Sequence, residues 1–317
     1  MASFYGVKGR TLQRYYKEQL SDFESWDKIE HAEKWLIFPD NIGPYLSIDE
    51  TALTHGELYT ILTNKSAKGK KGAIVAIIAG TSSDDIIKVI QKINLQSRNK
   101  VKEITLDMAG SMNNIAKVCF PKAQLVTDRF HVQKLAIEAL QEIRIKHRWE
   151  AIDAENEAIE KAKNQKKAYH PEILANGDTI KQTLARSRYL LYKRKHDWSE
   201  SQRKRAELLF ERYPDIEKAY DLTQELSRIF DYKGKKLYAT TKLALWHENV
   251  SKSGFKSFNT VSRTIQNHYK TILNYFDNRS TNASAESFNA KIKAFRSQFR
   301  GVTNIGFFLF RLTQIYA

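Results

Sequence analysis

The chain has 317 residues, of which 42% are hydrophobic and 28% are charged. A chain of this length and composition can bury a sizeable core, which excludes disorder as the default expectation. Its 52 lysines and arginines outnumber its 36 acidic residues, so the formal net charge is +16. This surplus favours a polyanionic partner, because each phosphate that a cation neutralises releases counterions. A basic housekeeping protein or an RNA-binding surface would also explain the charge, and composition does not address catalysis.

The expected compartment follows from what the sequence lacks. Cys119 is the single cysteine, so no disulfide can form within the chain. The N-terminus has no basic region followed by an apolar one, and no stretch reaches the roughly 18 apolar residues that a membrane helix needs. We therefore expect a cytoplasmic protein without a membrane partner.

Residues 1–43 are expected to form a helical segment. Apolar side chains recur there at helical spacing among charged ones: Leu12, Tyr15, Tyr16, Leu20 and Phe23. The segment resembles the last part of a helix-turn-helix unit, and an ordinary packing helix is an equal alternative. Pro39 and Pro44 then interrupt the chain.

A sheet is expected from Tyr45 onward, where the spacing of apolar residues changes. Alternating or continuous apolar runs predict five strands, at residues 45–49, 59–64, 73–80, 101–107 and 123–128. Helical patterns follow the third, fourth and fifth of these strands, at residues 82–93, 111–120 and from 131. Strands joined by tight turns, followed by strands that alternate with helices, predict an α/β fold: a mixed five-stranded sheet flanked by helices.

The middle of the chain is expected to be a large helical insertion. From residue 132 to residue 278, apolar residues recur at helical spacing among Glu, Lys and Arg, and the strand signal nearly stops. The expected organisation is an N-terminal segment (1–43), the first part of a catalytic core (44–131), the insertion (132–278) and the C-terminal part of the core (279–317).

Two aspartates close strands of the predicted sheet. Asp49 ends the first strand and Asp107 ends the fourth. If these strands are parallel neighbours, both carboxylates lie at one edge of the sheet, where their mutual repulsion would be relieved by a divalent cation. Mg²⁺ prefers such oxygen ligands. Each aspartate alone is weak evidence, because Asp at a strand end more often caps a helix or lies in a loop.

Glu286 adds a third carboxylate on the last predicted helix, which begins near Asn282. Cationic and amide side chains share its side of the helix, and an apolar stripe of Phe288, Ile292, Phe295 and Phe299 lies opposite. From residue 251 to residue 300 there are nine lysines or arginines and two acids. A surface helix of mixed charge would explain the cations, but it explains less well the polar run at residues 280–286 that leads into Glu286. The residues expected to contact DNA here are Asn282, Asn289, Lys291, Lys293, Arg296 and Arg300.

Asp128 and His131 follow the fifth predicted strand. In one interpretation Asp128 caps the next helix and His131 lies in its first turn. In the other, Asp128 is a further acidic group of the site and His131 hydrogen-bonds a phosphate oxygen or orients a carboxylate. The two interpretations are compatible.

With these residues assembled, the chain resembles the DDE transposases of bacterial insertion sequences. Four blocks carry the resemblance: Ser47-Ile-Asp-Glu50, Leu106-Asp-Met108, the Asp128-Arg-Phe-His131 element, and the stretch from Asn282 to Lys293. The resemblance implies a ribonuclease-H-like catalytic core in which Asp49, Asp107 and Glu286 bind two Mg²⁺, with Mn²⁺ as a substitute. It implies DNA cleavage at the ends of the element and strand transfer into target DNA.

The resemblance also implies partners. The protein would bind double-stranded DNA, both transposon ends and target, as a homodimer or higher assembly within the bacterial nucleoid. The insertion would contact transposon ends, with Trp246 stacking on a base unless it belongs to the core. Only some 40 residues precede the first catalytic strand, so we expect either that a separate polypeptide supplies the end-recognition domain or that the sequence is a shortened form.

Two other functions fit part of the pattern. A stand-alone two-metal nuclease would cut DNA without joining strands, and a non-catalytic DNA-binding protein would keep the fold without the chemistry. All three acidic residues are present, which argues against the second. The sequence leaves open whether Asp107 or Asp128 is the second metal ligand, and we prefer Asp107 because the fourth strand should neighbour the first.

Overall fold

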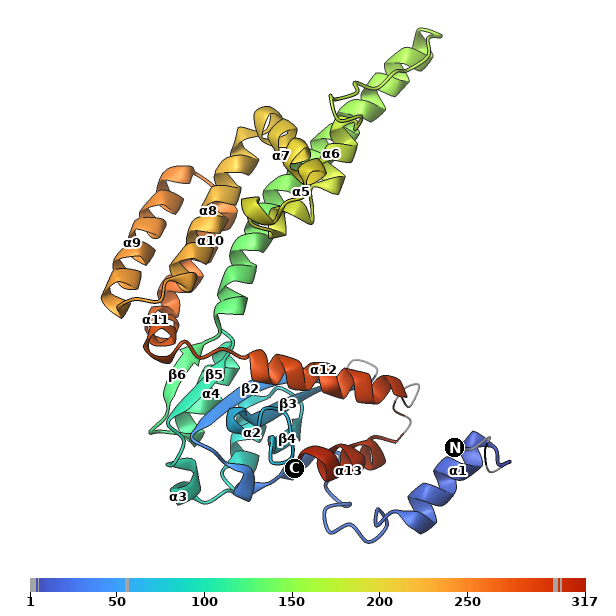
Figure 1. Ribbon diagram of the computed structural model, residues 1–317, viewed down its shortest axis with the longest axis vertical. Helices are drawn as coiled ribbons and strands as arrows, with labels where there is room; N and C mark the ends of the chain where they lie inside the picture. Colours follow the sequence, from blue (N-terminus) through green and yellow to red (C-terminus); the bar gives the residue numbers. More distant parts are fainter. Residues whose placement is uncertain (1–3, 5, 55–56, 299–301, 303) are drawn as a thin grey trace. The chain divides into compact units, whose positions relative to one another are not determined.

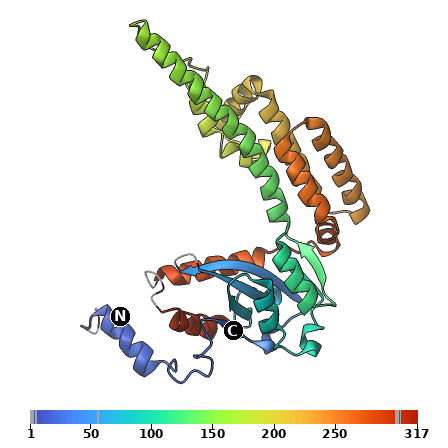
Figure 2. The same cartoon turned by 180° about the vertical axis from the view of Figure 1, so that it is seen from behind.

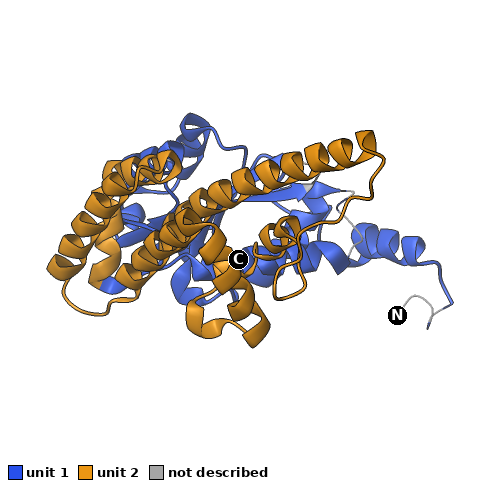
Figure 3. Ribbon diagram, turned by 90° about the horizontal axis from the view of Figure 1, so that it is seen from above, with its two compact units in different colours: residues 1–128, 278–317 blue, residues 129–277 orange. Residues whose placement is uncertain are grey.

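The computed structural model describes residues 4, 6–54, 57–298, 302 and 304–317 (Figure 1). Its contacts divide the chain into two compact units. Unit 1 contains the residues up to Asp128 together with Asn278–Ala317, and unit 2 contains Arg129–Asp277 (Figure 3). Each unit is described below by itself.

Among the described residues, unit 1 contains one mixed sheet of six strands in the order β1-β4-β3-β2-β5-β6. The strands are β1 (Trp35–Ile37), β2 (Tyr45–Thr54), β3 (Glu57–Asn64), β4 (Ile74–Ala79), β5 (Glu103–Leu106) and β6 (Gln124–Thr127). Three neighbouring pairs are antiparallel: β1–β4, β4–β3 and β3–β2. The other two pairs, β2–β5 and β5–β6, are parallel. The predicted α/β fold with a mixed sheet is thus confirmed.

The expected number of strands was wrong by one. Strand β1 lies in the segment that we expected to be helical, and it pairs antiparallel with β4. Its three residues contain a single buried side chain, Leu36, so no alternating pattern could reveal it. Helical structure in this segment is instead found in α1 (Gly9–Tyr15) and in a π-helical turn (Tyr16–Leu20).

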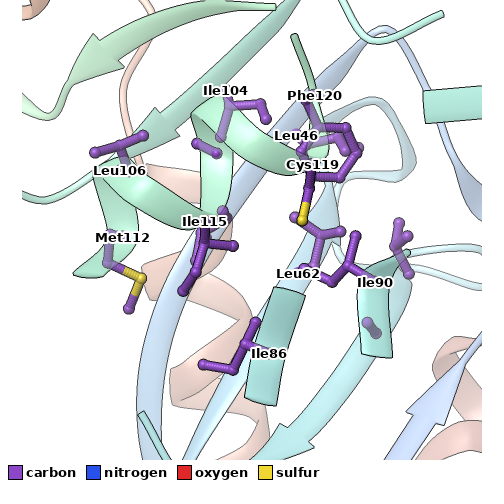
Figure 4. Packing of buried hydrophobic residues seen from close by; sticks show 14 of the residues in the cluster. Leu46, Leu62, Ile86, Ile90, Ile104, Leu106, Met112, Ile115, Cys119 and Phe120 are labelled. Carbon is purple, nitrogen blue, oxygen red and sulfur yellow. The ribbon is translucent and has the colours of Figure 1, made fainter. Parts of the chain in front are cut away.

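Apolar cores cover both faces of the sheet. On one face, Leu46, Ile104 and Leu106 pack against helices α2 (Ser83–Ile90) and α4 (Gly110–Cys119), as Figure 4 shows. Ile48 and the buried Cys119 belong to the same core. The short helix α3 (Leu95–Arg98) precedes β5. On the other face, residues of α12 (Ala283–Gln298) and α13 (Ile305–Tyr316) join a second core with β3 and β4 (Figures 1 and 2).

Unit 2 is built from helices. They are α5 (Arg129–Asn164), α6 (Ile180–Arg186), α7 (Glu200–Arg212), α8 (Pro214–Asp231), α9 (Lys236–Ser253), α10 (Lys256–Asn267) and α11 (Tyr269–Asn278). Two short 3-10 helices, Leu190–Tyr192 and Lys195–Asp197, lie between α6 and α7. Helices α6, α8 and α10 pack against α5. In the described part of the chain, no helix combines the length and the apolarity that crossing a membrane would require.

The contribution of β1 to the sheet can be measured by Leu36→Ala. Because Leu36 is fully buried in the second core, its truncation should lower the free energy of unfolding by about 2–4 kcal/mol. Urea denaturation followed by circular dichroism measures this change. Val118→Ala, at an exposed position on α4, is the matched control and should leave the midpoint nearly unchanged. Equal midpoints for the two variants would contradict a structural role for β1.

Candidate active site

Three aspartates lie on or directly after three neighbouring strands of the sheet. Asp107 and Asp128 directly follow β5 and β6, whereas Asp49 lies inside β2, so the prediction that Asp49 ends its strand was wrong. In the parallel β2–β5 pair, Ser47 lies opposite Thr105, so Asp49 and Asp107 are each two residues beyond a matched pair. In the β5–β6 pair, Leu106 lies opposite Thr127, so Asp107 and Asp128 each follow a matched pair directly. The predicted parallel pairing of the two strands that carry Asp49 and Asp107 is therefore confirmed.

Asp49 is held on both carboxylate oxygens. The backbone N–H of Glu50 donates to Oδ1 at 2.9 Å, and the side-chain amide of Asn289 donates from Nδ2 to Oδ2 at 2.6 Å. Since Leu46 and Ile48 belong to the core on the α2–α4 face, strand alternation directs Ser47 and Asp49 to the opposite, α12 face. Asn289 therefore orients this half-buried carboxylate from the other end of the chain.

Asp107 is oriented by the turn that precedes α4. Its Oδ1 accepts the backbone N–H of Ala109 at 2.8 Å. Asp107, Asp49 and Glu50 also interact electrostatically: burial raises the pKa of the Glu50 carboxyl, and the negative charges of Asp107 and Asp49 raise it further. This edge of the sheet thus concentrates negative charge that a cation would stabilise.

Helix α12 brings Glu286 to the same side of the sheet. Asn289 meets Asp49, and Arg296, about two turns later, donates to the carbonyl groups of Ala52 and Leu53 at 3.4 and 3.2 Å. The helix therefore runs in the same direction as β2, as Figures 1 and 2 show. Glu286 lies on the exposed first turn of this helix, three positions before Asn289 and hence on the same helical face.

The three predicted metal ligands do not form a closed group as they stand. Among the described residues, no set of three His, Cys, Asp or Glu side chains lies at metal-binding spacing. The structure brings Asp49 and Asp107 together by strand register, and it leaves the exposed Glu286 outside such a group.

The residues expected to contact DNA on α12 differ in their surroundings. Lys291 donates from Nζ to the carbonyl of Gly69 at 2.7 Å, and Arg296 is bound to β2. These two cations attach the helix to the sheet, whereas Lys293 is exposed. The apolar stripe opposite is confirmed, since Phe288, Ile292 and Phe295 are buried in the core. Arg300 and Phe299 lie outside the described residues.

Two predicted DNA contacts are wrong for this structure. Trp246 is 0% exposed within unit 2, and its indole N–H donates to the carbonyl of Leu222 at 2.8 Å. It is a core residue with a satisfied donor, and its ring cannot stack on a base. Asn282 is also 0% exposed, and among the described residues neither polar atom of its amide has a hydrogen-bond partner.

Asp128 is buried and His131 belongs to the other unit. Asp128 is 1% exposed, its backbone N–H donates to the carbonyl of Leu106, and neither carboxylate oxygen has a hydrogen-bond partner in the described part of the chain. The interpretation that Asp128 caps the next helix is therefore wrong. His131 lies in the first turn of α5 against the ring of Phe130, and its proposed function remains a prediction.

A buried polar cluster beside these aspartates was missed by the sequence reasoning. The ammonium group of Lys65 donates to Thr105 Oγ1 at 2.8 Å and lies 3.5 Å from Glu103 Oε1, while Asn278 donates to Glu103 Oε2 at 3.2 Å. Burial lowers the pKa of Lys65, and the carboxylates of Glu103 and Asp128 oppose this change. Lys65 thus compensates two buried acids. The available signal was Glu103, a charged residue at the start of a strand that also contains the apolar Ile104 and Leu106.

Comparison with known proteins identifies the family. A family described as Transposase, the ISL3-type DDE transposases, matches residues 46–312. The chain belongs to this family. It is also similar, at 21% identity over 317 residues, to the transposase for insertion sequence element IS1001 of Bordetella parapertussis; the alignment covers 98% of this chain and 68% of that protein. The resemblance seen in the four sequence blocks is confirmed, and the protein is a DNA transposase.

One solved structure is similar over most of its length. The Drosophila P element transposase strand transfer complex aligns with 97% of this chain and 84% of its own at 12% identity, with a TM-score of 0.37. A TM-score this low carries no argument about the fold or the site of this transposase.

The hydrogen bond from Asn289 to Asp49 predicts a positioning function. Asn289→Ala should raise the Mg²⁺ concentration for half-maximal DNA nicking by about 10-fold or more, because a carboxylate that loses its orienting partner binds metal less well. DNA affinity measured in EDTA should stay unchanged. Lys293→Ala is the contrasting variant and should lower DNA affinity. An Asn289→Ala variant with weaker DNA binding and an unaltered Mg²⁺ requirement would instead make Asn289 a DNA contact.

The buried cluster predicts a large effect of Lys65→Met on stability. Removing the cation leaves Glu103 and Asp128 buried without compensation, so the free energy of unfolding should fall by about 3–5 kcal/mol. Urea denaturation measures the loss, and Glu103→Gln added to Lys65→Met should restore part of it. Lys88→Met removes a cation from an exposed pair with Asp85 and should leave the midpoint unchanged. Similar midpoints for the two lysine variants would argue against charge compensation by Lys65.

Proposed function

We propose that this transposase cuts and joins DNA strands at a metal-dependent site made by Asp49, Asp107 and Glu286. The observation that carries the proposal is the parallel register of β2 and β5, which sets Asp49 beside Asp107 in a chain of a transposase family. A helix from the end of the chain packs along β2 and carries Glu286. This arrangement of a mixed sheet and a carboxylate-bearing helix is consistent with a ribonuclease-H-like core.

The donor set suits magnesium. Mg²⁺ binds a few hard carboxylate oxygens and retains water or phosphate as its other ligands, and the negative charges of the two half-buried aspartates both raise the pKa of the neighbouring Glu50. Two bound Mg²⁺, for which Mn²⁺ would substitute, would supply activation of an attacking oxygen and stabilisation of the leaving oxygen. The protein's own contribution is to orient Asp49 through Asn289, to orient Asp107 through Ala109, and to present Glu286 from α12.

Burial favours Asp107 over Asp128 as the second ligand. Asp107 is half-buried and directly follows the strand next to β2, whereas Asp128 is one strand farther from Asp49 and almost completely buried. A phosphate with its metal ions needs access from solvent. We therefore assign Asp128 a supporting function beside Asp107, electrostatically compensated by Lys65.

The partner that fits this chemistry is double-stranded DNA. The relative from Bordetella parapertussis is described as a transposase for an insertion sequence element, and the net charge of +16 suits a polyanion. We propose that the DNA comprises the ends of such an element and a target, that unit 2 contacts the ends, and that a homodimer or higher assembly forms on DNA in the nucleoid.

Single substitutions on labelled duplexes test the site. Asp49→Asn, Asp107→Asn and Glu286→Gln should each lower Mg²⁺-dependent nicking and strand joining by about 1,000-fold or more, equivalent to about 4 kcal/mol of transition-state stabilisation. DNA affinity in EDTA should persist in all three variants, because the exchanged groups keep their shape. Strand-joined products distinguish a transposase from a nuclease that only cuts.

Asp128→Asn is the comparison that decides the second ligand. It should retain partial activity if Asp107 binds the metal. Full loss in Asp128→Asn with activity left in Asp107→Asn would move the ligand to Asp128. Metal-dependent nicking that survives all four substitutions would show that the site lies elsewhere.

A further inference from the structure

Unit 2 carries a group of arginines and exposed tyrosines that the proposed active site does not use. Arg148 lies on α5, and Arg188, Tyr189 and Tyr192 lie between α6 and α7. Both tyrosines expose large parts of their rings, 69% for Tyr189 and 48% for Tyr192, and both arginines are exposed. These four residues are called the arginine–tyrosine surface below.

The backbone beneath this surface is firmly anchored. Leu190 and Leu191 are buried in the unit, and the indole N–H of Trp198 donates to the carbonyl of Leu190 at 2.8 Å. Tyr220 donates its hydroxyl to the carbonyl of Lys193 at 2.9 Å. The side chains of the surface are therefore displayed from a fixed scaffold, which lowers the entropy lost when they bind a partner.

Helix α5 is bonded to the same segment. Gln141 donates from Nε2 to the carbonyl of Arg188 at 3.3 Å, and the buried guanidinium of Arg144 donates to the carbonyl of Leu184 at 2.7 Å. These bonds connect the helix that carries Arg148 to the segment that carries Arg188. Both arginines thus belong to one rigid surface within unit 2.

The two arginines of this surface lie close to a third, buried arginine, Arg144. Burial lowers the pKa of Arg144, and the charges of Arg148 and Arg188 lower it further. Some other cations of unit 2 face acids, as Arg194 faces Asp231. By contrast, within the described residues neither arginine of the surface has a carboxylate at ion-pair distance. Close cations without an acid favour the binding of an external anion.

The side-chain chemistry selects phosphate on a nucleic acid. A guanidinium presents N–H groups in a planar fork that matches phosphate oxygens. The guanidinium of Arg188 lies 5.4 Å from the ring centroid of Tyr189, a contact that holds the cation beside an exposed ring. Exposed aromatic rings among cations are typical of surfaces that track a sugar–phosphate backbone.

We propose that the arginine–tyrosine surface binds the phosphate backbone of duplex DNA. The two guanidinium groups contact phosphates, and the two tyrosines lie against the adjacent sugars. The inference depends on the proposed function for the choice of DNA as the polyanion, and it does not depend on the metal site.

Binding in the absence of metal tests the surface. The full-length chain is titrated into a fluorescein-labelled duplex of random sequence in EDTA, and fluorescence anisotropy is measured over a range of salt concentrations. Arg148→Ala combined with Arg188→Ala should weaken binding by about 10-fold or more and reduce the slope of log K against log salt by about two. Tyr189→Ala combined with Tyr192→Ala should weaken binding with little change in slope, because neither ring is charged.

The matched control removes the same charge elsewhere in unit 2. Arg212 and Lys252 face Glu172 and Glu248, so Arg212→Ala combined with Lys252→Ala should change binding little. Thermal melting followed by circular dichroism verifies that every variant folds. Unchanged affinity in the Arg148/Arg188 variant, or an equal loss in the control, would overturn the proposal.

The experiments give different results if the arginine–tyrosine surface does not bind DNA and if the proposed function is wrong. EDTA removes the metal, so binding is measured without cleavage. A wild-type chain that binds DNA through the surface and never nicks it in Mg²⁺ would contradict only the proposed active site. A chain that nicks DNA and binds equally well without Arg148 and Arg188 would contradict the surface alone.

Discussion

Repulsion between like charges is the constraint on which unit 1 depends. Asp49, Glu50 and Asp107 are close enough for their charges to raise the pKa of Glu50. Carboxylates in such proximity are costly unless donors or cations stabilise them. Backbone N–H groups supply two of the donors, at Glu50 for Asp49 and at Ala109 for Asp107. The amide of Asn289 supplies a third, which couples the sheet to a helix far away in the sequence.

That helix is held in place by cations and apolar side chains together. Lys291 and Arg296 donate to backbone carbonyl groups, while Phe288 and Ile292 pack into the core on the same face of the sheet. The binding of α12 along β2 therefore does not rely on DNA or metal. Glu286 lies exposed in the first turn of this helix, three positions before Asn289.

Charge compensation also separates the buried cluster of unit 1 from the exposed surface of unit 2. Lys65 lies beside Glu103 and interacts with Asp128, so that cluster is largely compensated by the protein itself. The exposed Arg148 and Arg188 instead both lower the pKa of Arg144, and among the described residues neither has a carboxylate at ion-pair distance. The first arrangement stabilises the fold, and the second favours an anion from outside. The same electrostatic rule thus yields a structural cluster in one unit and a proposed DNA surface in the other.

Local patterns in the sequence determined much of the architecture and the two aspartates. Alternation and apolar runs predicted β2 to β6, and the resulting order predicted that Asp49 and Asp107 lie on parallel neighbours. Helical spacing predicted the buried stripe of α12 and the helical nature of unit 2. Such patterns are readable because the side of an element that faces the core repeats with the period of that element.

Only the tertiary structure decided which polar and aromatic side chains meet. Trp246 is a core residue because α9 turns it inward, and Asn289 holds Asp49 because α12 packs along β2. The pairing of Lys65 with Glu103 and the three-residue β1 were likewise invisible. These contacts join residues far apart in the chain, and no local periodicity records them. The sequence therefore determined the elements and their order, and packing between distant segments decided how the site is held.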